Sequence, residues 1–146
     1  MRIVRLPGIH HDSNAVLALG NLGNILIDAG TSWYQTLQVE RIKGIIGDQS
    51  LDRVLLTSRR YPCSGGAAHI ASEFASCTIH IHPDGQSSLA KGDFFTTWAN
   101  RFDSDMPITN AEPVTDEDIF PLGNGQISVL SLPGHSSDGL GYYVKE

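Results

Sequence analysis

The chain has 146 residues, of which 40% are hydrophobic and 18% are charged, a composition typical of folded proteins and not of disordered or fibrous ones. We expect a single domain over residues 1–146, because ordinary domains hold about 100–150 residues. Sixteen acidic residues against ten lysines and arginines give a net charge of −6. An acidic surface repels nucleic-acid phosphates, so we expect no nucleic-acid partner.

The sequence also lacks the features of membrane and secreted proteins. No segment approaches the ~20 apolar residues of a membrane span, and the first residues carry no apolar run like that of a signal peptide. Two cysteines, Cys63 and Cys77, are too few for a disulfide framework. We therefore expect a cytoplasmic protein with no membrane partner.

Short apolar runs bounded by turn residues predict β-strands along the chain. These strands cover residues 2–6, 14–19, 24–28, 53–57, 78–82, 126–132 and 141–145. Residues 21–24 are turn formers and predict a hairpin between the second and third strands. The whole pattern, hairpin strands followed by strand–helix alternation, predicts a mixed α/β domain.

Helix-forming patterns lie between these strands. They cover residues 31–47, 67–75, 88–91 and 94–101. Thr31 or Ser32 is expected to cap the first of these helices, because a hydroxyl oxygen can accept from the free N–H groups of a first helical turn. Residues 58–66 are predicted to form a polar loop, and residues 83–85 are predicted to break the chain after the strand at 78–82.

Four short motifs follow one another in the chain. They are LIDAG at residues 26–30, VLLT at 54–57 with a loop that ends in Gly65-Gly66, LGNGQI at 122–127, and LPGHS at 132–136. Their order and spacing resemble the metallo-β-lactamase superfamily, in which one strand ends in Asp-x-Gly, the next in Thr-His-x-His-x-Asp-His-x-Gly-Gly, and a later one in Pro-Gly-His-Thr or Pro-Gly-His-Ser. The resemblance covers residues 2–145 and implies an αββα sandwich, here shortened at the C-terminus.

The resemblance also implies where a metal would bind. Zinc is the cofactor of the family, and a catalytic zinc site needs three protein ligands and a bound water. In this chain the four ligand positions of the Thr-His loop are Ser58, Arg60, Pro62 and Cys63, of which only the thiol is a zinc donor. Of the motif ligands His135 is kept. We therefore predict no cofactor, with Cys63 and His135 as remnants of the metal site.

The favoured function is a zinc-free, non-catalytic protein that binds a partner or a small anion through the former active-site face. Arg59 and Arg60 bring positive charge to this face, next to the helix that begins near Gly66, and Ser58 lies beside them. By the resemblance, Asp28 accepts hydrogen bonds from the loop at residues 58–63.

Two alternatives stay open. One is an atypical hydrolase of esters, thioesters or lactones, in which Cys63 is the nucleophile, His135 is the base, and the two arginines lower the pKa of the thiol. The other is an N-terminal fragment of a longer hydrolase, because related enzymes continue past the Pro-Gly-His strand with a second half of the sheet.

Two further features bear on partners and metals. The strand at 141–145 would leave an open edge, which predicts pairing with a partner subunit or with a second copy in a homo-oligomer. His80 and His82, followed by Asp84, look like a displaced His-x-His-x-Asp motif, since alternate residues of a strand share a face. The next residue is Gly85 and not the fourth ligand, so we interpret this segment as a polar strand end.

Overall fold

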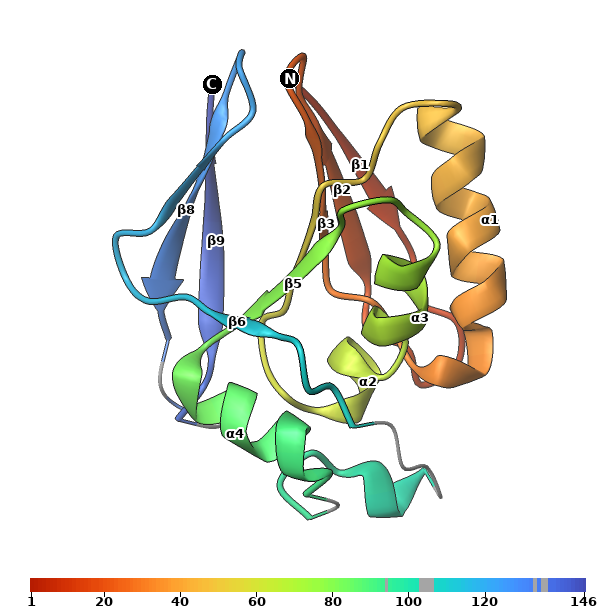
Figure 1. Cartoon of the computed structure of the whole chain (residues 1–146), viewed down its shortest axis with the longest axis vertical. Coiled ribbons are helices and arrows are strands. Elements are labelled where there is room, and N and C mark those ends of the chain that lie inside the picture. Colours follow the sequence, from red (N-terminus) through yellow and green to blue (C-terminus); the bar gives the residue numbers. More distant parts are fainter. Residues whose placement is uncertain (94, 103–106, 133, 135–136) are drawn as a thin grey trace.

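The structure is a computed structural model that describes residues 1–93, 95–102, 107–132, 134 and 137–146, and it contains two β-sheets that face each other (Figure 1). The larger sheet has the order β1-β2-β3-β4-β5-β6. Its strands are β1 (Arg2–Leu6), β2 (Ala15–Leu19), β3 (Asn24–Ile27), β4 (Arg53–Leu55), β5 (Thr78–Ile81) and β6 (Glu112–Pro113). The smaller sheet has the order β7-β8-β9, with β7 (Ile119–Pro121), β8 (Gln126–Ser131) and β9 (Leu140–Lys145).

Strand direction in the larger sheet changes at β3. The first three strands are antiparallel, and the predicted hairpin between β2 and β3 is confirmed by a hydrogen bond of 2.9 Å from Gly20 N to Gly23 O. From β3 to β6 the strands are parallel. The carboxyl ends of parallel strands meet at one edge of a sheet, so the loops that follow β3, β4 and β5 lie together there.

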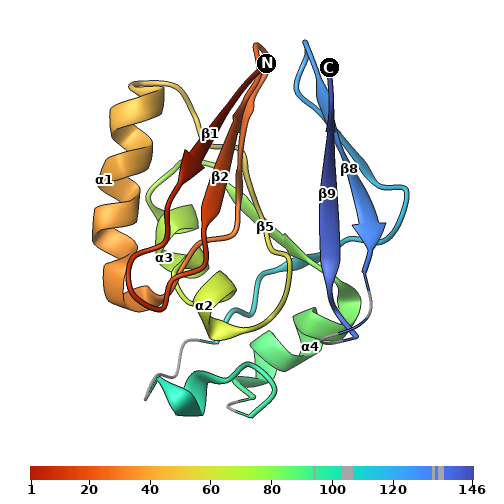
Figure 2. The same ribbon diagram turned by 180° about the vertical axis from the view of Figure 1, so that it is seen from behind.

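The helices pack mainly on one side of the larger sheet. They are η1 (Ser32–Tyr34), α1 (Gln35–Ile46), α2 (Tyr61–Ser64), α3 (Ala67–Ser72), α4 (Pro83–Lys91) and η2 (Ala99–Arg101). Figures 1 and 2 show α1 and α3 on the outer face of the larger sheet, the smaller sheet on its other face, and α4 across one end of both. Within the described part of the chain, no helix is long and apolar enough to cross a lipid bilayer.

Each face of the larger sheet is buried in its own apolar core, because successive side chains of a strand point to opposite faces. On the helix side, Leu26 packs with Ile42 and Ile70. On the other side, Ile25 packs with Phe120 and residues of the smaller sheet. The molecule is therefore layered as helix, sheet and sheet, and among the described helices none covers the outer face of the smaller sheet (Figures 1 and 2).

The predicted helix starts were less accurate than the strands. The expected cap at Thr31 or Ser32 is wrong: α1 begins at Gln35, and the Thr31 hydroxyl donates to the Asp12 carboxylate. Residues 83–85 do not break the chain but begin α4, with Pro83 in the first turn, where its missing N–H is tolerated.

Two other predicted segments also differ from the structure. The loop at residues 58–66 contains the short helix α2, with Pro62 in its first turn. Of the helix expected over 94–101, the described residues form turns followed by η2 at Ala99–Arg101. Trp98, which precedes η2, adopts a left-handed backbone conformation with φ of 65°, and this conformation is incompatible with a continuous helix through the segment.

Candidate active-site pocket

A pocket of about 340 Å³ opens where the loop after β4 meets the loop between β8 and β9. Its described lining residues are Thr57, Ser58, Arg60, Pro62, Cys63, Trp98, Leu132, Gly139 and Leu140. The two loops are joined by a hydrogen bond of 2.9 Å from Leu140 N to Thr57 O. The structure thus brings together three of the residues that the sequence analysis selected, Ser58, Arg60 and Cys63.

Backbone hydrogen bonds hold the loop after β4 in place from three sides. Pro62 O accepts from Ser13 N at 3.0 Å, and Cys63 O accepts from Ala29 N at 2.8 Å. On the opposite side of the loop, Tyr61 N donates to Thr97 O at 2.6 Å. The loop is therefore fixed by the segments around it, independently of any bound ion.

Asp28 lies behind the pocket, at the end of β3. Thr57 donates to its carboxylate twice, from the backbone N at 2.9 Å and from Oγ1 at 2.8 Å. Burial raises the pKa of this carboxyl to about 7 against the lowering effect of the two hydrogen bonds. The resemblance implied donors within residues 58–63, whereas the observed donor is the residue just before them.

Cys63 carries its thiol in the pocket wall, with Sγ 3.8 Å from Thr57 Oγ1. Burial raises its pKa to about 11, and the nearby Asp28 carboxylate adds to this effect. The expectation that Arg59 and Arg60 lower the pKa of this thiol is therefore wrong. At neutral pH the group is a neutral thiol, which is a weak nucleophile and a weak ligand.

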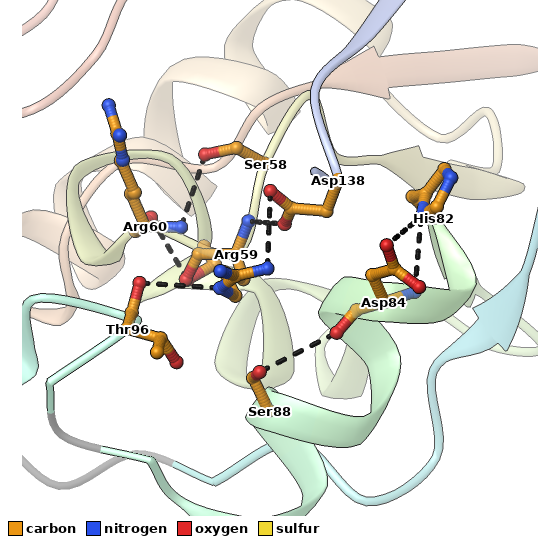
Figure 3. Close-up of polar contacts among 9 residues, drawn as sticks. Ser58, Arg59, Arg60, His82, Asp84, Ser88, Thr96 and Asp138 are labelled. Carbon is orange, nitrogen blue, oxygen red and sulfur yellow. Dashed lines mark hydrogen bonds and ion pairs between the residues drawn. The ribbon is translucent and has the colours of Figure 1, made fainter. Parts of the chain in front are cut away.

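Arg59 is bound to a buried carboxylate and is not a lining residue of the pocket. Its backbone N donates to Asp138 Oδ2 at 2.6 Å, and its guanidinium Nη1 lies 3.5 Å from Asp138 Oδ1. Asp138 is fully buried, while the Arg59 side chain is 15% exposed. Figure 3 shows Arg59 turned toward Asp138 and the Arg60 side chain pointing away from it.

Arg60 lies over an indole ring at the pocket. Its Cζ is 3.9 Å from the centroid of the Trp98 ring, and Arg101 contacts the same ring at 4.6 Å. In such cation–π contacts the charged guanidinium stacks parallel to the face of the aromatic ring. The backbone N of Arg60 donates to Ser58 Oγ at 3.1 Å, as drawn in Figure 3.

Comparison with known proteins finds similarity at the level of structure. No protein-family model and no curated protein matches the sequence. The MIM-2 metallo-β-lactamase matches with a TM-score of 0.76 at 23% identity, over 97% of this chain and 52% of its own. BJP-1, a subclass B3 metallo-β-lactamase of Bradyrhizobium japonicum, matches with a TM-score of 0.76 at 18% identity, over 90% of this chain and 50% of its own.

This chain has the metallo-β-lactamase fold. The predicted fold class is thereby confirmed, and the chain spans about half the length of these solved structures. A Cronobacter sakazakii metallo-β-lactamase described by a HARLDQ motif also matches, with a TM-score of 0.74 at 18% identity, over 92% of this chain and 52% of its own. At such identities the likeness shows the fold, and function has to be argued from the site.

Zinc does not fit the described residues of this metallo-β-lactamase fold. Ser58 Oγ accepts from a backbone N–H, Arg60 is a cation, and Pro62 has no donor side-chain atom. Within the described ranges, no group of three His, Cys, Asp or Glu side chains is placed to hold a metal ion. His135, the predicted partner of Cys63, lies outside the described residues.

The two histidines at the end of β5 do not meet at one site. His80 pairs with Thr78 Oγ1 at 2.8 Å through Nε2, and its Nδ1 lies 3.6 Å from the Glu112 carboxylate. His82 caps α4 by accepting from Asp84 N at 3.0 Å. Burial lowers the pKa of His80. In the structure each of these two histidines therefore has polar partners of its own.

Sequence reasoning missed two residues of the pocket region, Asp138 and Trp98. Asp138 is 79 residues from Arg59 in the chain, and no motif links them. Trp98 lies within the helix expected over 94–101, and only the folded chain places its ring against Arg60. No local signal in the sequence would have identified either contact.

Proposed function

We propose that this metallo-β-lactamase-fold chain is a zinc-free, non-catalytic protein that binds a small anionic ligand in the pocket between Thr57 and Leu140. The observation that carries the proposal is the position of Arg60, which stands where the resemblance expects a histidine ligand and lines the pocket. Among the described lining residues it is the one side chain ionised at neutral pH, since burial keeps the Cys63 thiol protonated. A fixed cation beside such a pocket attracts an anion and repels a metal ion.

The neighbouring positions of the loop support the same interpretation. Residues 58–63 read SRRYPC, and the HARLDQ motif of the Cronobacter protein also has arginine at its third place. That motif keeps His and Asp at its first and fifth places, where this chain has Ser58 and Pro62. Zinc binding is therefore disfavoured by Ser58 and Pro62, which stand in place of a histidine and an aspartate, as well as by the arginine.

Metal analysis and an activity panel test the proposal. The purified chain is incubated with zinc, desalted and analysed for bound metal, and we expect far less than one zinc per chain. The same protein is assayed on ester, thioester and lactone substrates, and we expect no hydrolysis. About one tightly held zinc per chain that is lost on Cys63→Ala or His135→Ala would overturn the proposal, and so would hydrolysis that disappears in either variant.

Assembly is a separate part of the proposal and rests on β9. This strand forms one edge of the smaller sheet, as predicted for residues 141–145, and Tyr143 on it is 57% exposed. An unpaired edge favours pairing with another strand, from a partner subunit or a second copy. Light scattering over a wide concentration range measures self-association, and a strict monomer would count against a homo-oligomer.

A further inference from the structure

We propose that a second pocket, here called the far pocket, binds an apolar dipeptide in its zwitterionic form, with the terminal ammonium at Asp52 and the terminal carboxylate at Arg53. The far pocket has a volume of about 610 Å³. Its described lining residues are Leu22, Gly23, Asp52, Arg53, Ser76, Thr78, Pro121, Leu122 and Gly123. The inference goes beyond the proposed function, because it concerns another site and does not depend on the absence of zinc.

The far pocket lies at the other end of the strands from the pocket at Arg60. Asp52 and Arg53 stand at the beginning of β4, whereas the pocket at Arg60 is formed by the loop that follows the same strand. Gly23 belongs to the turn before β3, and Gly123 to the turn between β7 and β8. The far pocket is thus formed where the two sheets end, at the end of the molecule that holds both chain termini (Figure 1).

The Arg53 guanidinium is held over a buried aromatic ring. Its Cζ lies 5.2 Å from the centroid of the Phe120 ring, and Phe120 is 8% exposed. His80 packs edge-on against the same ring with the centroids 5.3 Å apart, so the ring itself is fixed. Within the described part of the chain, Arg53 forms no ion pair. Its fork of N–H donors matches the two oxygens of a carboxylate.

Two hydrogen bonds from neighbouring turns orient the Asp52 carboxylate. Oδ2 accepts from Asn24 N at 2.8 Å, and Oδ1 accepts from Ser50 Oγ at 3.0 Å. Each carboxylate oxygen has two lone pairs, so both oxygens still have room for a further donor. A Cβ at position 23 would lie 2.9 Å from Asp52 Oδ2, and the glycine found there leaves this space empty. The carboxylate is therefore fixed in direction and accessible to an ammonium group.

Asp52 and Arg53 line one pocket without pairing with each other. Their charged atoms lie farther apart than the 4.0 Å of an ion pair, so one ligand contacts both only if its own charges are separated. An anion is repelled by Asp52 and by the net charge of −6, and a simple cation is repelled by Arg53. A zwitterion has no net charge and carries one group of each sign, as the two side chains require.

The other described lining residues suit the body of a dipeptide. Leu22, Pro121 and Leu122 contribute apolar surface, and the transfer of an apolar ligand side chain onto Leu22, which is 81% exposed, is favourable. Ser76 and Thr78 bring hydroxyl groups, which form hydrogen bonds with peptide groups. The volume of about 610 Å³ lies within the range of ligand sites, roughly 300 to 1,000 Å³. A dipeptide occupies more of this volume than a single amino acid does.

Isothermal titration calorimetry with leucyl-leucine tests the proposal. N-acetyl-leucyl-leucine is the ligand without the ammonium, and leucyl-leucinamide is the ligand without the terminal carboxylate. We expect leucyl-leucine to bind at least about tenfold more tightly than either, because hydrogen bonds between charged groups are the strong ones. The measurement is repeated at high salt, which screens the long-range field of the acidic protein, and the preference should persist there.

Two variants exchange the charged partners one at a time. Asp52→Asn is expected to weaken leucyl-leucine binding about tenfold and to change the affinity for N-acetyl-leucyl-leucine less than about twofold, because this ligand has no ammonium. Arg53→Gln is expected to weaken leucyl-leucine binding by a similar factor and to change the affinity for leucyl-leucinamide less than about twofold. Circular dichroism confirms that each variant is folded.

Matched controls remove one charge of each sign outside the described lining of the far pocket. Glu40 on α1 and Arg5 on β1 are both exposed. Glu40→Gln and Arg5→Gln should each change the affinity for leucyl-leucine less than about twofold, since exposed charges at a distance are screened by salt.

The outcomes separate this inference from the proposed function. Equal affinities for the three ligands, equal effects of the far-pocket and control variants, or no binding of leucyl-leucine by the folded chain would each overturn the dipeptide proposal. A preference for leucyl-leucine that needs both Asp52 and Arg53 supports it. The metal analysis reports on the pocket at Arg60, so a chain that retains zinc would overturn the proposed function and leave the dipeptide result unchanged.

Discussion

Two of the pockets lie toward opposite ends of the strands of the larger sheet, and their described lining residues differ in charge. The far pocket, of about 610 Å³, is the larger and is lined by Asp52 and Arg53 together, so a carboxylate and a guanidinium face the same space. In the pocket of about 340 Å³, Arg60 lines the wall while Asp28 and Asp138 lie buried behind it. Among the described residues, the wall of the smaller pocket therefore carries a guanidinium, and the two carboxylates lie behind it.

The carboxylates of the two ends are also held differently. Asp52 accepts from Asn24 N at 2.8 Å and from Ser50 Oγ at 3.0 Å, both in neighbouring turns of the half-buried rim. Asp28 and Asp138 are 7% and 0% exposed, and each ties together segments distant in the sequence. The comparison indicates that buried carboxylates with dedicated donors hold the frame of the smaller pocket.

The largest expected difference between the two ends is in the free energy of unfolding that is lost when Asp138 or Asp52 is replaced. Asp138→Asn leaves the Arg59 guanidinium, 15% exposed, without the charge it faces at 3.5 Å, and breaking a buried pair in this way costs about 3–5 kcal/mol. Asp52→Asn at the far end is expected to cost about 1 kcal/mol, since its donors are a backbone N–H and a hydroxyl at a half-buried site. Urea unfolding of the two variants gives both values. Similar losses in the two variants would remove the distinction drawn here.

The second prediction concerns the pH dependence contributed by Asp28. Its folded-state pKa of about 7 lies above the ordinary value of 3.8, so the folded state binds the proton more tightly than the unfolded state. The free energy of unfolding should therefore decrease as pH rises from about 4 to about 7, by up to roughly 4 kcal/mol.

His80 has the opposite effect, because its pKa is lowered on folding and its contribution to stability is lost as pH falls below 6.5. The measurement is therefore the difference between the stability curves of the native chain and Asp28→Asn, taken by denaturant unfolding between pH 4 and pH 8. If Asp28 titrates as described, the difference in the free energy of unfolding between the two proteins narrows toward pH 4. A constant difference would show that Asp28 does not titrate in this range.

The third prediction compares one thiol from each end. Burial raises the pKa of Cys63 to about 11 and also raises that of Cys77, near the far pocket, to about 11. At pH 8 the thiolate fraction of each should be about 100-fold below that of an ordinary cysteine, and alkylation by iodoacetamide correspondingly slow. Cys77→Ser and Cys63→Ser isolate each thiol in turn. Rapid alkylation of Cys63 alone would restore the hydrolase alternative.

Most of the fold could be predicted from the sequence because strand signals are local. Runs such as residues 53–57 combine β-branched and apolar residues with flanking turn formers, and strands followed at nearly the expected positions. The helix starts depend on which partners compete for the capping side chains, and these partners can be distant in the sequence. Thr31 is a good cap in isolation, but the Asp12 carboxylate accepts its hydroxyl and its backbone N–H.

The site could be predicted in part. Ser58, Arg60 and Cys63 share one loop, so a motif position was enough to bring them to the pocket. The different fates of Arg59 and Arg60 were not predictable, because they depend on Asp138 and Trp98, which only the folded chain places next to them. The same holds for the thiol, whose pKa responds to burial and not to its sequence neighbours.

The smallest expected effect concerns the contact between the two sheets beside the pocket. Tyr142 OH donates to Leu56 O at 2.6 Å, and this carbonyl belongs to a fully buried residue that precedes Thr57. Tyr142→Phe should cost about 1–2 kcal/mol in thermal or urea unfolding, because a buried acceptor loses its donor. Tyr143→Phe is the matched control on the same strand, since its side chain is 57% exposed on the outer face and should change stability by less than about 0.5 kcal/mol. Equal losses of stability in the two variants would show that the contact between the two sheets does not depend on this hydrogen bond. The position of Leu140 in the pocket wall would then be set by apolar packing and by the backbone hydrogen bond from Leu140 to Thr57.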